Sequence, residues 1–477
     1  MYEKDVHSPG YHYICFFTKT TPRKKNTVLY TTRSTGSDIG LFTMFILSES
    51  GKNKRINQTE NSPMTNSIST LAGAEFEGRW KWSTSVLGAD KCVYGIPNDA
   101  RRVVKFNPVD KSLTEIGPDL GTRSTKWMGG VLAKNDCIYC TPYGSGRFLK
   151  IDTIKGTVKT FNIKLPESRY GMWAVGALAL DGCIYYMPQS AKRILKLNPE
   201  DDSVTSVGDD FGGGLYMYKY MGIVVGIDGC LYGIPFSSKR IVKFNPIDQT
   251  TSFVGKEAQE KFMCGNGVLG RDGYIYAANT FGHVLRIDTV NNSYDFVGGA
   301  VMTSHKDKRW GDPVLGIDGC IYWPPHNATH VLKFNPETNE TSLVGDNLGN
   351  ASMKYISGAL APDGAVCCIP ANATQVLIID PSMEFLMKFK ADMKQHPIEF
   401  GLLFEKNNDG KTTYEDAVTK YGKERTLQMI GSCIPHDDAF LHSNLYPFMA
   451  AASCKNSAVA VIYYLLTRNP SGIGGLS

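Results

Sequence analysis

The sequence lacks a strong net charge, a long apolar run and the short motifs of the common enzyme classes. Its 477 residues include 51 Lys or Arg and 46 Asp or Glu, which leaves a net charge of only +5. So small an excess argues against a dedicated nucleic-acid-binding protein, whose positive charge is usually concentrated. The longest apolar runs, residues 39–47 and 457–466, are shorter than the about 20 residues of a membrane span. We therefore expect neither a nucleic-acid partner nor a membrane partner.

Catalytic and metal-binding patterns are also missing. The chain contains no nucleophile elbow, no phosphate-binding P-loop and no HExxH motif, and it has no two CxxC pairs of the kind that hold zinc. Its start, MYEKDVHSPG, does not have the charged-then-apolar layout of a secretory signal. These absences predict an intracellular, cytoplasmic protein without a metal or another cofactor.

An internal repeat occupies the middle of the chain. Each copy has a short apolar strand with an anchor residue, usually Tyr, and then Pro in most copies. A second, mostly basic and apolar strand follows and ends in Asn-Pro, Asp-Thr or Asp-Pro. The spacings between successive anchors are 45, 46, 47, 44, 46 and 45 residues. The anchors are Tyr94, Tyr139, Tyr185, Tyr232, Tyr276, Tyr322 and Cys367. So regular a period predicts a repeat architecture.

Each repeat divides into four short strands. In the third copy we expect strands at residues 173–180, 183–187, 193–197 and 203–207, with Asp181-Gly182 forming a type I′ hairpin turn between the first two. Four strands in about 45 residues are typical of a β-propeller blade. The fold prediction is therefore all-β, with a seven-bladed β-propeller over residues 76–391. A solenoid of β-hairpins is the rival architecture, and seven repeats, which close a ring well, favour the propeller.

The cysteines follow the repeat. Five of them share one repeat position: Cys92, Cys137, Cys183, Cys230 and Cys320. Equivalent positions in separate blades lie farther apart than the about 7 Å between Cα atoms that a disulfide allows. We therefore expect free, buried thiols, which support a reducing compartment.

The two ends of the chain lie outside the repeat. Residues 1–75 are predicted to be mostly irregular, with short β-like runs at 11–17 and 41–47, and part of this segment could lend a strand that closes the ring. In residues 392–477, the runs DGKTTYEDA (409–417) and YPFMAAA (446–452) resemble two degenerate ankyrin repeats. We expect a small helical unit packed on the propeller. A partial EF-hand pattern overlaps the first run, but Glu405 and Asp416 replace the usual first Asp and last Glu.

The repeat CIYxxPxxxxRVLKxNP resembles that of uncharacterised seven-bladed β-propeller proteins of unicellular algae, and it is broadly similar to kelch and NHL propellers. The resemblance covers about residues 76–391. It implies the propeller fold and brings no catalytic residues or cofactor. The fifth copy departs from the pattern at Tyr274, Asn279 and Thr289, and the seventh departs at Cys367 and Ile378.

One set of side chains is a candidate binding surface. In a four-stranded meander the first and third strands begin at the same end of the blade, so their opening residues gather on one face. The candidates are five cations that open first strands, the Trp residues that follow, and the Arg and His residues that open third strands: Lys81, Lys126, Lys219, Arg309 and Lys354; Trp82, Trp127, Trp173 and Trp310; Arg102, Arg147, Arg193, Arg240, His283 and His330. The aromatic rings could instead pack between blades, and the arginines could pair with loop acids.

Two classes of function follow from this face. We expect a monomeric, non-enzymatic binding or scaffold protein, whose basic, aromatic-backed face and helical tail bind a protein partner or a small anionic ligand. The alternative is a propeller lyase or hydrolase that uses the same face, with His283 and His330 cooperating from neighbouring blades.

Overall fold

The computed structural model divides the chain into two compact units, Met1–Met64 and Thr65–Ser477. The structure describes residues 68–162, 171–214, 217–280, 282–299, 310–384, 410–423 and 425–427, and the backbone of four strands in the first unit. There β1 (Tyr2–Ser8) pairs antiparallel with β2 (Tyr11–Phe17), and β3 (Val28–Thr31) pairs with β4 (Leu41–Met44). The β-like runs expected near residues 11 and 41 are therefore strands.

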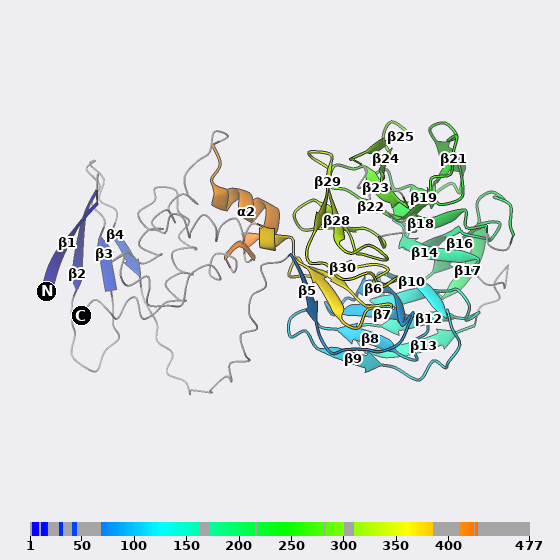
Figure 1. Cartoon of the computed structure of the whole chain (residues 1–477), viewed down its shortest axis with the longest axis horizontal. Coiled ribbons are helices and arrows are strands. Elements are labelled where there is room, and N and C mark those ends of the chain that lie inside the picture. Colours follow the sequence, from blue (N-terminus) through cyan, green and yellow to red (C-terminus); the bar gives the residue numbers. More distant parts are fainter. Residues whose placement is uncertain are drawn as a thin grey trace. The chain divides into compact units, whose positions relative to one another are not determined.

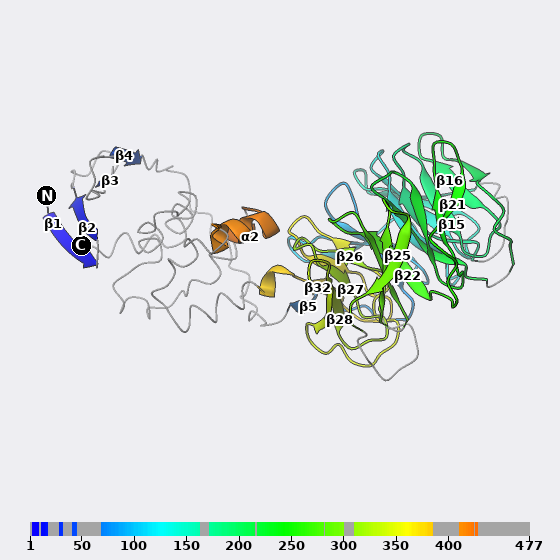
Figure 2. The same cartoon turned by 90° about the horizontal axis from the view of Figure 1, so that it is seen from above.

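The second unit contains seven four-stranded antiparallel sheets, and Figures 1 and 2 show them following one another in chain order from blue and cyan to yellow. The first four blades are β6 (Trp82–Leu87), β7 (Val93–Pro97), β8 (Val103–Phe106) and β9 (Leu113–Ile116); β10 (Trp127–Leu132), β11 (Cys137–Pro142), β12 (Phe148–Asp152) and β13 (Thr157–Phe161); β14 (Trp173–Leu178), β15 (Ile184–Pro188), β16 (Ile194–Asn198) and β17 (Ser203–Val207); β18 (Tyr220–Val225), β19 (Leu231–Pro235), β20 (Ile241–Phe244) and β21 (Thr251–Val254).

The other three blades have the same strand order. They are β22 (Cys264–Leu269), β23 (Ile275–Asn279), β24 (Val284–Asp288) and β25 (Ser293–Val297); β26 (Val314–Leu315), β27 (Ile321–Trp323), β28 (Val331–Asn335) and β29 (Glu340–Val344); β30 (Ala359–Leu360), β31 (Val366–Cys368), β32 (Val376–Ile379) and β5 (Ser69–Ala72). Each inner strand contacts the inner strand of the next blade, and β30 contacts β6. The ring is therefore closed, which confirms the seven-bladed β-propeller and rules out the solenoid.

The ring is closed by a strand from the N-terminal side of the repeats. β5 pairs antiparallel with β32 and forms the outer strand of the seventh blade. The Ser69 hydroxyl also accepts a hydrogen bond from the Asp346 amide at 2.8 Å, which joins this strand to the sixth blade. A segment before residue 76 thus supplies the closing strand that the sequence suggested.

The apolar core lies between the blades. Seven clusters of buried side chains are present in the described residues, one at each junction of neighbouring blades. Cys137 belongs to the cluster between the second and third blades, and Cys140 belongs to the cluster between the first and second. Cys137 and Cys140 have CxxC spacing, but their side chains lie on opposite sides of β11 and cannot bind the same metal ion. All nine cysteines in the described part of the chain are free.

A repeated backbone hydrogen bond joins neighbouring blades near the start of the inner strand at six of the seven junctions in the described residues. The Lys81 amide donates to the Ala371 carbonyl of the seventh blade at 3.1 Å, and the Lys126 amide donates to Asn98 of the first at 3.0 Å. The corresponding donors Gly171, Lys219, Met263 and Lys354 bond to Tyr143, Gln189, Phe236 and His326. We call this repeated bond the seam.

The turn after each inner strand differs from the prediction. Gly182 has φ 82°, but Asp181 is not among the residues with positive φ, so the type I′ prediction was wrong. The Gly182 amide donates to the Ala179 carbonyl at 3.0 Å, and the Ala179 amide donates to Cys183 at 2.9 Å, which describes a three-residue loop with a bulge glycine. The Asp181 carboxylate stabilises this loop by accepting the Cys183 amide at 3.0 Å.

A helix follows the propeller. α2 (Thr413–Tyr421) begins with a capping box between Thr412 and Glu415 and buries Tyr414, Ala417 and Tyr421. Arg425, just beyond the helix, bonds to the Asp380 carboxylate and the Ser382 hydroxyl at the edge of the seventh blade. Within the predicted helical unit, residues 413–421 are therefore helical and Arg425 is bonded to the propeller, and the second ankyrin-like run lies outside the described residues. None of the helices in the described ranges has the length and apolar character that a membrane span requires.

The closing strand makes a direct prediction. A chain that starts at residue 76 should unfold with a lower free energy than one that starts at residue 66, because it loses the β5–β32 ladder and the buried Ile68. From the burial of one Ile side chain and the pairing of four residues, we expect the free energy of unfolding to fall by roughly 3 kcal/mol. Urea denaturation measures the difference, and equal stabilities of the two chains would show that β5 does not close the ring.

Candidate functional site

The lysines of the candidate face are buried. Lys81, Lys126 and Lys354 are each at most 5% exposed, and Lys219 is 8% exposed. The Lys81 ammonium donates to the carbonyls of Gly78, Ala371 and Ala373 at 2.8–3.0 Å. Burial lowers the pKa of Lys81 to about 8, and it does the same for Lys354.

The ammonium groups of Lys126 and Lys219, two further lysines of this face, also donate to backbone carbonyls. Lys126 donates to the Arg123 carbonyl at 2.9 Å, and Lys219 donates to Ala191 and Gly212 at 2.8 and 2.7 Å. These ammonium groups tie loops to the starts of the inner strands, so the structure favours a packing role for them. Arg309 lies outside the described residues.

The four tryptophans of the candidate face are buried between the blades. The indole Nε1 groups of Trp82, Trp127 and Trp173 donate to the backbone carbonyls of Arg102, Arg147 and Arg193 at 2.7–3.1 Å. Trp310 makes the same bond to His330 at 3.0 Å. Each indole thus fixes the backbone of the residue that opens the third strand of its blade.

The arginines at those opening positions reach the surface. We call the end of the ring where the third strands begin the arginine face, after Arg102, Arg147, Arg193 and Arg240. Arg102 is partly buried and donates to the Gly117 carbonyl, whereas Arg147, Arg193 and Arg240 are exposed. Arg193 donates to the Gly208 carbonyl at 2.6 Å. Arg240 pairs with Glu257 at 2.9 Å and lies over the Phe253 ring.

The histidines of this face have separate neighbours. His283 is exposed and its ring meets the edge of Phe296. The Nδ1 atom of His330 lies 2.8 Å from the Thr329 hydroxyl, and that of the buried His326 lies 2.9 Å from the Asn327 amide oxygen. The described residues contain no group of three His, Cys, Asp or Glu side chains that could hold a metal ion.

The opposite end of the ring, the turn face, carries a polar motif that the sequence analysis did not identify. In the third blade the anchor Tyr185 donates to Asp181 at 2.7 Å, and Lys196 of the third strand pairs with the same carboxylate at 3.0 Å. Asp90, Tyr94 and Lys105 repeat this arrangement in the first blade, and Asp228, Tyr232 and Lys243 repeat it in the fourth. The signal was visible as a cation that recurs inside an apolar strand, at Lys105, Lys150, Lys196, Lys243, Arg286 and Lys333.

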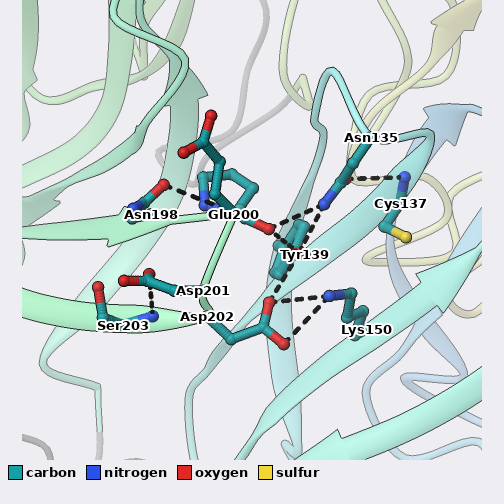
Figure 3. A network of polar contacts seen from close by, with 10 residues as sticks. Asn135, Cys137, Tyr139, Lys150, Asn198, Glu200, Asp201, Asp202 and Ser203 are labelled. Atoms are coloured by element: carbon teal, nitrogen blue, oxygen red, sulfur yellow. Dashed lines mark hydrogen bonds and ion pairs between the residues drawn. The ribbon is translucent and has the colours of Figure 1, made fainter.

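The second blade obtains its carboxylate from its neighbour. Asn135 stands where the other blades have Asp, and Figure 3 shows Asp202 of the third blade pointing toward Tyr139 and Lys150. Tyr139 donates to Asp202 at 2.8 Å, and Lys150 lies 2.8 Å from the same oxygen. In the seventh blade, Cys367 stands at the anchor position and Ile378 at the position of the cation. Both side chains are buried, so an apolar pair replaces the polar motif there.

The comparisons with known proteins agree with the fold. No protein-family model matches this chain, and no curated protein matches it. A solved streptogramin B lyase has a TM-score of 0.54 and 16% identity, over 65% of this chain and 97% of that chain. A catalytically inactive virginiamycin B lyase from Staphylococcus aureus, solved with quinupristin, has a TM-score of 0.53 and 13% identity, over 65% and 99%. At these identities the likeness shows the propeller fold alone.

The carboxylates of the turn face predict how stability depends on pH. Burial raises the pKa of Asp90, Asp181 and Asp228, but hydrogen bonds from the lysine, the tyrosine and a backbone amide of each blade outweigh it, so each pKa is lowered. A carboxyl whose pKa is lower in the folded state stabilises the fold above its unfolded pKa of about 3.9, and this stabilisation is lost as the pH falls through the folded pKa.

We therefore expect a variant with Asp90→Asn, Asp181→Asn and Asp228→Asn to lose less stability than the wild type between about pH 5 and pH 2. Denaturant unfolding at a series of pH values measures this. Glu115→Gln, Glu200→Gln and Glu337→Gln, at exposed positions without an ion pair in the described residues, are the matched control and should keep the wild-type slope. Parallel curves for all three proteins would contradict the assignment.

Proposed function

We propose that this protein is a non-enzymatic binding protein whose arginine face binds an acidic protein segment or a small anion. The observation that supports this proposal most strongly is the exposure of Arg147, Arg193 and Arg240 at one repeat position of three successive blades. In two of these blades an indole hydrogen bond holds the backbone carbonyl of the arginine. Three guanidinium groups on a rigid frame attract anions and offer bidentate contacts to carboxylate or phosphate.

The contacts already made by these arginines limit the affinity. Arg193 and Arg240 have partners at Gly208 and Glu257, which a ligand would displace or share. Exposed charge pairs are also screened by salt. We therefore expect modest, salt-sensitive binding.

The C-terminal part offers a second surface. We infer that residues 392–477 form a degenerate ankyrin-like unit, and the capping box of α2 and the Arg425–Asp380 pair support its start and its attachment. The free thiols support a reducing, intracellular location. On this proposal the protein acts as a monomer and needs no cofactor.

A propeller lyase or hydrolase is the weaker candidate. It would require His283 and His330 to act on one substrate, and each ring has its own local neighbour, Phe296 and Thr329. The similarity to lyases is one of fold and supplies no reacting residues.

Binding of a labelled peptide made of Asp and Glu tests the proposal. The variant Arg147→Ala, Arg193→Ala and Arg240→Ala should bind it at least about tenfold more weakly than the wild type in fluorescence anisotropy at low ionic strength, because three contacts worth a few tenths to one kcal/mol are removed. Lys134→Ala, Lys155→Ala and Arg271→Ala, which remove the same charge from exposed positions on the turn face, are the matched control.

The melting temperature of each variant separates binding from stability. If the arginine variant melts earlier but binds the peptide as the wild type does, the arginines are structural and the proposal fails. Equal losses of binding in both variants would also contradict it, since net charge alone would then explain the effect.

A further inference from the structure

A pocket of about 340 Å³ lies between the first and second blades, on the arginine face. Its floor includes Leu120, Trp127 and Val158, which belong to the apolar cluster that joins these two blades. Arg123 and Arg147 line it from two different loops and are both exposed. The volume suits a small ligand with a single ring, near the lower end of the usual range of about 300–1,000 Å³.

The charges around this pocket are predominantly positive. Lys126 also lines it, and its ammonium group holds the Arg123 carbonyl at 2.9 Å, which fixes the loop that carries Arg123. Asp119 is the one carboxylate in the lining, and it already accepts hydrogen bonds from the Arg101 guanidinium and, at 2.8 Å, from the Gly121 amide. An anion that enters the pocket therefore meets two guanidinium groups and a neutralised carboxylate.

Arg147 differs from its equivalents in the other blades. Arg102 and Arg193 each donate to the carbonyl of a glycine 15 residues farther along the chain. In the second blade that position is Asn162, and the Arg147 guanidinium has no hydrogen bond or ion pair with any residue in the described ranges. Beside the apolar floor, the second blade thus presents a guanidinium that is bonded to no other group among the described residues.

We propose that this pocket binds a small phosphate monoester with an apolar body. The phosphoryl group would lie between Arg123 and Arg147, because a dianion matches two guanidinium groups and offers each of them a bidentate contact. The apolar body would lie on Leu120 and Trp127. This inference rests on the proposed function of the arginine face and names the ligand class for one site on it.

Titration calorimetry of the intact protein with phenyl phosphate at low ionic strength tests the inference. We expect Arg147→Ala and, separately, Arg123→Ala to weaken binding at least about tenfold, which is about 1.4 kcal/mol. Arg271→Ala is the matched control, since it removes the same charge from an exposed position on the turn face, and it should leave the affinity within about twofold. Inorganic phosphate should bind more weakly than phenyl phosphate, because it leaves the apolar floor uncovered.

The outcomes distinguish this site from the wider proposal. Absent binding of phenyl phosphate, or equal weakening by Arg147→Ala and Arg271→Ala, overturns the pocket. If the acidic peptide still binds in an arginine-dependent way, the proposed function survives that result. If neither probe binds, both the pocket and the proposed function fail. Melting temperatures close to the wild type would show that each substitution leaves the fold intact.

Discussion

The seam between blades is the contact on which the rest of this structure depends. In the described residues of six blades, one amide near the start of the inner strand reaches back to a carbonyl of the preceding blade, from Lys81 to Ala371 at the ring's closing junction and from Lys126 to Asn98 at the next. The chain enters several of these strands through a left-handed residue, such as Trp80 with φ 53° and Thr125 with φ 52°. The buried lysines and tryptophans beside the seam tie the loops to it. The apolar clusters can then form between blades, because the seam fixes the separation of neighbouring inner strands.

The two faces of the ring use their cations differently. On the turn face, Lys196 is paired with Asp181 and lies over the ring of Tyr185, so its charge is balanced within the blade. On the arginine face, Arg147 opens the third strand of its blade with an exposed guanidinium, and its backbone carbonyl accepts a hydrogen bond from the Trp127 indole. The same repeat that neutralises one end therefore leaves positive charge at the other. This asymmetry is the physical basis of the binding proposal.

The sequence predicted the fold because seven copies of one pattern repeat at nearly constant spacing. Strand limits were predicted to within two residues in the third blade, where β14 ends at Leu178 instead of residue 180. The turn type was mispredicted because the Asp181 side chain stabilises a longer loop than Asp-Gly alone suggests. The described thiols are all free, as predicted, but the prediction of burial fails at Cys230, which is half-buried.

The candidate site was harder to predict because it depends on contacts between blades. A lysine in a sequence suggests an exposed charge, but Lys354 is buried with its ammonium group on the Gly349 and Ala351 carbonyls, which no pattern of residue types specifies. The carboxylate that Asn135 does not provide in the second blade comes from Asp202 of the third blade, which is likewise a contact between two blades. Arg147, Arg193 and Arg240 are exposed, and their role as a binding face stays a prediction.

Hydrogen exchange at the seam amides tests the closed ring most directly. In a closed ring the Lys81 amide, which joins the seventh blade to the first, should be protected as strongly as the Lys126 and Lys219 amides, because all three bonds open only when a blade separates from its neighbour. Fast exchange at Lys81 beside slow exchange at Lys126 and Lys219 would show that the ring is open at this junction and would contradict the account.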